Sequence, residues 1–160
     1  MKRFILAIFM TLFMATLAMA TAYDVTKGGT TGIPANAPGP YVLEYYINAD
    51  AANAGAGYGA GDTLKFMAVP AGAVVYGVQV EIDTAEGAAC TFDVGDSASA
   101  TGYFSNVDAN NATVDSAILT FGASAPKYYA ATDDLLITFD SATTDAFKGW
   151  VRVIFMPFKQ

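Results

Sequence analysis

The stretch from Ala73 to Asp96, AVVYGVQVEIDTAEGAACTFDVGD, constrains the fold more than any other part of this sequence. Its first half alternates apolar and polar residues, and a β-strand places successive side chains on opposite faces. TAEGA then predicts a turn in which Gly87 takes a positive φ. The pattern predicts a hairpin of a half-buried antiparallel sheet. The side chains expected to face the core are Val74, Tyr76, Val78, Val80, Ile82, Cys90, Phe92 and Val94, and those expected to face solvent in the first strand are Gly77, Gln79, Glu81 and Asp83.

Similar short strands recur along the rest of the chain, without a convincing amphipathic helix. Their spacing predicts an all-β fold, an antiparallel β-sandwich of about eight strands (jelly-roll or Ig-like) over residues 41–160. A hydrophobic content of 54% with 13% aromatic residues suits a packed β core and excludes a disordered chain or a coiled coil. The polar run SASATGYFSNVDANNAT after Asp96 is expected to connect strands. Besides the two strands of the hairpin, the expected strands are 41–47, 63–69, 116–121, 127–131, 134–139 and 147–158.

Residues 1–22 have the pattern of a secretory signal peptide. Lys2 and Arg3 precede a long apolar run, and Ala18-Met19-Ala20 supplies an A-x-A cleavage site, with Ala20-Thr21-Ala22 as a second candidate. One alternative is a retained hydrophobic helix, because the run is nearly long enough to span a bilayer. Another is a true start at Met19. We expect cleavage, which would leave no membrane segment in the mature chain.

Residues 23–40, rich in glycine and proline, are expected to form an extended arm. Proline removes a backbone donor and disfavours helical geometry in the residue before it. The arm is interpreted either as a linker left after export or as a segment that lies on a neighbouring subunit.

The charge balance limits the classes of partner. Removal of residues 1–20 takes away Lys2 and Arg3 and no acidic residue, which changes the net charge from −7 to −9. A surface this acidic repels phosphate backbones, so we expect no nucleic-acid partner.

No reaction site can be assembled from the sequence. The chain has no histidine, which removes the commonest general base and the histidine-dependent nucleophile systems. Cys90 is expected to be a buried, inert thiol. Acidic residues in pairs are interpreted as a solvated face, with a calcium site in the loops as a minor alternative. We therefore expect no enzyme, no catalytic residue and no cofactor. The acidic pairs are Glu81 and Asp83, Asp93 and Asp96, and Asp133 and Asp134, and 111–113 form a glycosylation sequon only for a host that glycosylates.

The last strand, GWVRVIFMPF, is apolar on both faces. Val151, Val153 and Phe155 form a normal core set. A sandwich leaves the outer face of each sheet in water, and monomers rarely expose an apolar stripe. The stripe is expected to be covered by the arm or, as our sharper hypothesis, by a neighbouring subunit, with an acidic partner for the arginine. The predicted interface residues are Trp150, Arg152, Ile154, Met156 and Phe158.

The run from Val69 to Asn111 resembles a pattern found in small virion structural proteins of tailed bacteriophages. In that pattern a VPAG turn leads into a strand, followed by DTAEGA, T-x-DVGD, a Gly-Tyr/Phe element and a Val-Asp-x-Asn turn. KYYAATDDLLITF and the valine-rich last strand are similar to the second half of the same group, so the resemblance covers most of residues 41–156. It implies a β-sandwich head decoration, fibre or minor capsid protein without catalytic residues. The signal-like N-terminus departs from it, since virion proteins are made in the cytoplasm.

Together these patterns predict a non-enzymatic, self-assembling structural subunit. Its expected partners are copies of itself or other capsid or surface subunits, and its expected location is a virion surface. The alternative is an exported bacterial β-sandwich module that binds carbohydrate or a surface and is secreted or periplasmic after signal cleavage.

Overall fold

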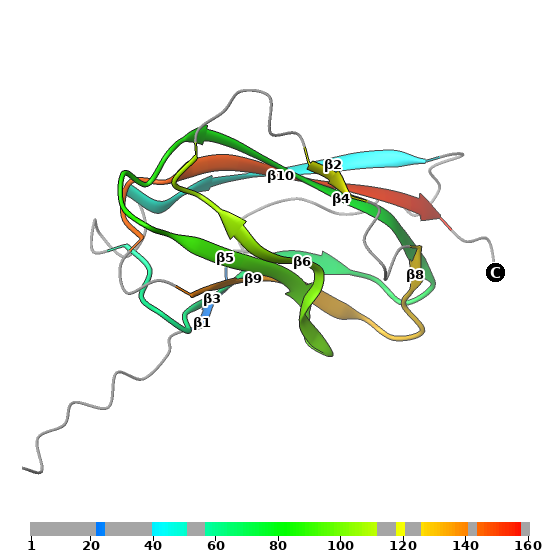
Figure 1. Ribbon diagram of the computed structural model, residues 1–160. Helices are drawn as coiled ribbons and strands as arrows, with labels where there is room; N and C mark the ends of the chain where they lie inside the picture. The colour runs from blue at the N-terminus through cyan, green and yellow to red at the C-terminus, as the bar shows by residue number, and fades with distance from the viewer. Residues whose placement is uncertain are drawn as a thin grey trace, which may run out of the picture.

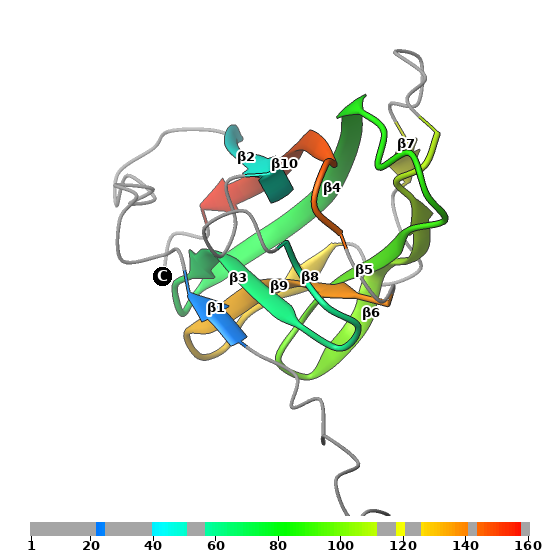
Figure 2. The ribbon, with the colours of Figure 1, turned by 90° about the vertical axis from the view of Figure 1, so that its left-hand side faces the viewer.

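The computed structural model describes residues 22–24, 40–50, 57–111, 118–120, 126–140 and 144–157. In these residues the fold is all-β, as predicted, and two sheets lie face to face around one core (Figures 1 and 2). Sheet A has the strand order β1-β3-β9-β5-β6, formed by β1 (Ala22–Asp24), β3 (Thr63–Val69), β9 (Asp133–Phe139), β5 (Thr91–Asp96) and β6 (Ser99–Asp108). Sheet B has the order β2-β10-β4-β7, formed by β2 (Tyr41–Asn48), β10 (Lys148–Pro157), β4 (Ala73–Thr84) and β7 (Ile118–Thr120), and β8 (Lys127–Tyr128) also pairs with β4. No helix in the described ranges is long and apolar enough to cross a membrane.

The two halves of the stretch from Ala73 to Asp96 lie in different sheets, so the predicted hairpin is wrong. β4 pairs with β10 in sheet B, whereas β5 pairs with β6 and β9 in sheet A. The turn at Gly87, which has the predicted positive φ of 81°, therefore carries the chain across the sandwich. Two amphipathic strands can bury their apolar faces by pairing within one sheet or by packing against each other from two sheets. The alternation of residues is the same in both arrangements and does not distinguish them.

The predicted faces of β4 hold except at its start. Val78, Val80 and Ile82 are buried as expected, but Tyr76 is 40% exposed and Val75 is buried in its place. The register against β10 shifts here: Ile154 faces Gly77, and Phe155 faces Val75. The extra residue of this β-bulge is Tyr76, and the bulge reverses the alternation on its N-terminal side.

The polar run after Asp96 is a strand, β6, and not the expected connection. It pairs with β5 and points Tyr103, Phe104 and Val107 into the core. Two register shifts and a positive φ of 55° at Asn106 interrupt its alternation, which explains why periodicity missed it. Gly95 permits the tight hairpin, because a Cβ there would lie 2.0 Å from the Ser99 carbonyl oxygen.

Aromatic side chains from both sheets fill the space between the layers. The Phe92 ring lies 6.2 Å from that of Phe139 and 5.3 Å from that of Phe147, and Tyr58 stacks on Phe139 at 4.2 Å. Cys90 is buried as predicted, with its Sγ 3.1 Å from the Thr144 Oγ1. The largest fully buried side chains are Phe66, Phe92, Phe139, Phe147, Phe155, Ile47, Leu64, Met67, Leu135, Ile137, Val69 and Val75.

Glu86, in the crossing from β4 to β5, anchors the segment that leads into β10. Its carboxylate is nearly buried and accepts hydrogen bonds from the backbone N–H groups of Asp145, Ala146 and Phe147 at 3.0, 3.1 and 2.8 Å. Three adjacent amides aimed at one carboxylate form an anion-binding concavity that this side chain fills. The sequence predicts DTAEGA only as a turn and carries no local signal for this role of Glu86.

We expect Glu86→Gln to lower the free energy of unfolding by about 2 kcal/mol, because hydrogen bonds to a charged acceptor are the stronger kind and one amide hydrogen of glutamine would face a backbone N–H. Urea unfolding followed by circular dichroism measures the change. Asp83→Asn, at an exposed residue of the same strand exit, is the control and should change stability little. Equal stability of both variants would contradict the anchoring role.

Candidate interaction face on sheet B

Large apolar side chains gather on the outer face of sheet B. Among the described residues, the exposed large hydrophobics are Val42 (52%), Tyr46 (39%), Tyr76 (40%) and Tyr128 (53%), and all four come from strands of this sheet. None of these four comes from the strands of sheet A whose side-chain burial the structure describes, where the exposed and half-buried residues include Lys65, Thr101 and Asp134. Among the residues compared, the outer face of sheet B is therefore more apolar than that of sheet A. We call the outer side of β2, β10, β4 and β8 the sheet B face.

Cross-strand pairs organise this face in rows. Ile154 on β10 faces Val42 on β2, and Trp150 faces Tyr46, with ring centroids 4.7 Å apart. These β10 side chains are half-buried by their own neighbours. Pairs of this kind between aromatic and β-branched residues stabilise adjacent strands, so the face is a fixed surface and not a set of free side chains.

Arg152 lies in the middle of the sheet B face between two acidic residues of the same chain. Its Nε donates to the Glu44 Oε1 on β2 at 2.5 Å, and its Nη1 donates to the Glu81 carboxylate on β4. The guanidinium also lies 6.0 Å from the centre of the Trp150 ring. The hydrogen bonds with Glu81 and Glu44 raise the pKa of Arg152 above its ordinary value.

Four of the five predicted interface residues therefore lie on one face. Trp150, Arg152, Ile154 and Met156 share the outer side of β10, and Phe158 lies outside the described residues. The acidic partner expected from a neighbouring subunit is instead found within the chain. Val42 and Tyr46 were not among the predicted interface residues, although their alternation with Leu43, Tyr45 and Ile47 in YVLEYYI places them on the outer side.

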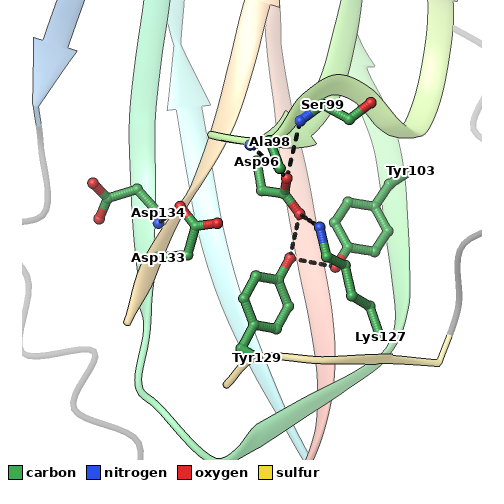
Figure 3. Close-up of polar contacts among 8 residues, drawn as sticks. All are labelled: Asp96, Ala98, Ser99, Tyr103, Lys127, Tyr129, Asp133 and Asp134. Atoms are coloured by element: carbon green, nitrogen blue, oxygen red, sulfur yellow. Dashed lines mark hydrogen bonds and ion pairs between the residues drawn. The ribbon is translucent and has the colours of Figure 1, made fainter. Parts of the chain in front are cut away.

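A second polar cluster lies at one end of the sandwich and joins the two sheets (Figure 3). Asp96, at the end of β5, is buried; its Oδ2 accepts from the Tyr129 hydroxyl at 2.6 Å and from the Lys127 ammonium. Its Oδ1 accepts from the backbone N–H groups of Ala98 and Ser99 at 3.0 and 3.1 Å. The Tyr129 hydroxyl has one hydrogen, which it gives to Asp96, so Tyr103 donates to Tyr129 across 2.7 Å.

The protonation states in this cluster follow from burial and these contacts. Burial alone would raise the pKa of Asp96, but the hydrogen bonds from Lys127 and Tyr129 and the Lys127 charge outweigh it and hold the pKa below its usual value. Burial, with the nearby Asp96 charge, raises the pKa of Tyr103 to about 12 and raises that of Tyr129 as well. The cluster thus holds an ionised carboxylate fully engaged by donors, which suits a cross-link between sheets better than proton transfer.

The other acidic residues singled out in the sequence are not gathered into one site. Glu81 binds Arg152, Asp134 binds Lys65 at 2.8 Å, and the Asp93 Oδ1 accepts from the Asn106 N–H at 2.8 Å. In the part of the chain that the structure describes, no group of three or more histidine, cysteine, aspartate or glutamate residues is placed to hold a metal ion.

Comparisons with known proteins give a fold and no family. No family model and no curated sequence matches this chain. Among solved structures, the chain is similar to one from the capsid of Ralstonia phage GP4, at 16% identity and a TM-score of 0.58, covering 89% of this chain and 100% of that one. It is also similar to chains from the acidic stable capsid of Helicobacter pylori bacteriophage KHP30 (17% identity, 73% and 86% covered, TM-score 0.46) and from the Cyanophage Pam1 capsid asymmetric unit (22% identity, 83% and 96% covered, TM-score 0.45).

The chain from the Ralstonia phage GP4 capsid shares its fold with this protein, so the resemblance to phage virion structural proteins drawn from the sequence is confirmed at the level of the fold. The class that the structure defines is a two-sheet, mainly antiparallel β-sandwich with exposed apolar side chains on the outer face of sheet B.

Proposed function

We propose that this protein is a non-enzymatic structural subunit of a phage-like virion, a capsid decoration, fibre or minor capsid component, and that it assembles through the sheet B face. The observation that carries the proposal is the location of the four exposed large hydrophobics on this one face. The fold shared with a chain of the Ralstonia phage GP4 capsid supports the virion context.

The chemistry of the sheet B face is that of a subunit contact. Interface cores are enriched in aromatic residues, methionine and arginine, and depleted in unpaired charge. Here Tyr46, Trp150 and Met156 supply the apolar contacts, while Arg152 is already paired by Glu44 and Glu81. Docking on this face therefore does not require a lone charge to be buried, which would be costly.

We expect Ile154→Lys combined with Met156→Glu to weaken self-association by at least about 30-fold, because interface hot-spot contacts are worth more than about 1 kcal/mol each and both substitutions place charge in the contact. Both side chains lie on the outer face of β10, so the core is untouched and the far-UV circular dichroism should be unchanged. Sedimentation velocity and light scattering over a concentration series measure the association.

The matched control places the same two charges on the opposite sheet. Ala68→Lys combined with Thr101→Glu changes exposed residues of β3 and β6 and should leave the oligomer intact. Equal effects of the two double variants would contradict an interface on sheet B. A strict monomer of the unmodified protein at high concentration would contradict the self-assembling subunit and favour the exported binding module.

A further inference from the structure

The structure shows where the N-terminal arm begins. β1 adds a parallel strand to the edge of sheet A, with Ala22 facing Thr63, Tyr23 facing Leu64 and Asp24 facing Lys65 (Figure 2). β3 forms the edge beneath it, since its other side pairs with β9. An open sheet edge presents unpaired backbone groups and accepts a further strand. The arm residues Tyr23 and Asp24 therefore lie in a strand at the edge of sheet A.

The pairing between β1 and β3 in the described residues is short. Beyond Lys65, the register of β3 against β9 shifts before Met67, which disturbs the regular edge that a longer strand would need. Among the residues that the structure describes, three register pairs join β1 to β3. Releasing β1 therefore breaks few hydrogen bonds, and an identical strand from another chain would restore all of them.

The connection between β1 and β2 is longer than docking within one chain requires. β1 ends opposite Lys65 in sheet A, and β2 begins at Tyr41, which faces Phe155 in sheet B. Strand rise, strand spacing and sheet separation place these points about 20 Å apart. Residues 25–39 reach about 50 Å when extended, so the same strand can reach the β3 edge of an adjacent copy.

Three features carry the inference: the short pairing of β1 with β3, the position of β3 at the edge of sheet A, and the length of residues 25–39. We infer that β1 is exchanged in the assembled state, so that β1 of one copy occupies the β3 edge of a neighbouring copy. Exchange of an identical element costs no contacts and links the subunits covalently through residues 25–39. The inference rests on the proposed self-assembly, to which it adds a second connection, away from the sheet B face.

Cysteine cross-linking between two single variants tests the exchange directly. Ala22→Cys and Thr63→Cys place thiols on directly paired residues, at a Cα separation that a disulfide tolerates. The two variants are mixed as unfolded chains, refolded together to the oligomer and mildly oxidised. We expect a band at about twice 16.7 kDa on a non-reducing gel, because only exchange brings the two thiols of different chains together. Cys90, which is buried, stays in every variant.

Ala22→Cys mixed with Ala68→Cys is the matched control, since Ala68 is an exposed residue of β3 that is out of register with β1, and this pair should give no such band. The double variant Ala22→Cys/Thr63→Cys reports pairing within one chain. An oligomer in which only this internal disulfide forms would overturn the exchange and leave the proposed function standing. An unmodified protein that is strictly monomeric would overturn both. Free thiols in the double variant would overturn the β1–β3 pairing itself.

Discussion

Val80→Asp is expected to lower the free energy of unfolding by at least about 3 kcal/mol, enough to unfold a domain of marginal stability. Val80 lies in the middle of β4, fully buried, and faces Val151 on β10. An aspartate there would place an unpaired charge in the core between the sheets, where no solvent or cation compensates it. Urea unfolding monitored by far-UV circular dichroism measures the loss.

Two control variants place the same aspartate on the exposed side of β4, and so distinguish the effect of burial from the effect of an aspartate anywhere in this strand. Gln79→Asp changes the next residue, which lies on the sheet B face opposite Arg152, and should shift stability by less than about 0.5 kcal/mol. Tyr76→Asp should also be tolerated, because the bulge turns Tyr76 outward. A Val80→Asp variant as stable as Gln79→Asp would mean that the faces of β4 are reversed, and an unfolded Tyr76→Asp variant would contradict the bulge.

Asp96→Asn is expected to destabilise the protein by about 3 kcal/mol at neutral pH, since hydrogen bonds to a charged group and broken buried ion pairs carry costs of this size. The asparagine oxygen can still accept from the Ala98 and Ser99 N–H groups. Its amide group, however, would face the Lys127 ammonium and the Tyr129 hydroxyl in place of a carboxylate oxygen. Thermal and urea unfolding of both proteins give the difference.

The same substitution has a defined pH dependence. The folded-state pKa of Asp96 lies below its unfolded value of about 3.9, so the ionised carboxylate stabilises the fold above that pH, and this contribution is lost as the pH falls through the folded-state pKa. The stability difference between the unmodified protein and Asp96→Asn should therefore be constant above about pH 5 and shrink below about pH 4. A difference that is unchanged down to pH 2 would show that the Asp96 charge is not what joins the sheets.

The local elements of this protein can be predicted from its residues alone. Alternation placed β2, β3, β4, β9 and β10 close to their observed bounds, because a period of two is a property of each strand alone. The same reasoning identified the core set of β10 and the apolar stripe on its outer side, since both faces of one strand can be read from one run of residues. The likeness to virion proteins also came from such local turn and strand motifs.

The choice of neighbouring strands, in contrast, depends on how the two sheets pack together. The partners of β4 and β5 depend on packing between layers, and a sandwich and a hairpin bury the same alternating residues. Glu86 reaches backbone amides some sixty positions away, and Asp96 is joined to Lys127 of β8 in the other sheet and to Tyr129, which follows β8. The sheet B face likewise unites Val42 and Tyr46 with a strand more than one hundred residues later. Such contacts leave no periodic signal, because they join side chains across space after the chain has crossed between the sheets.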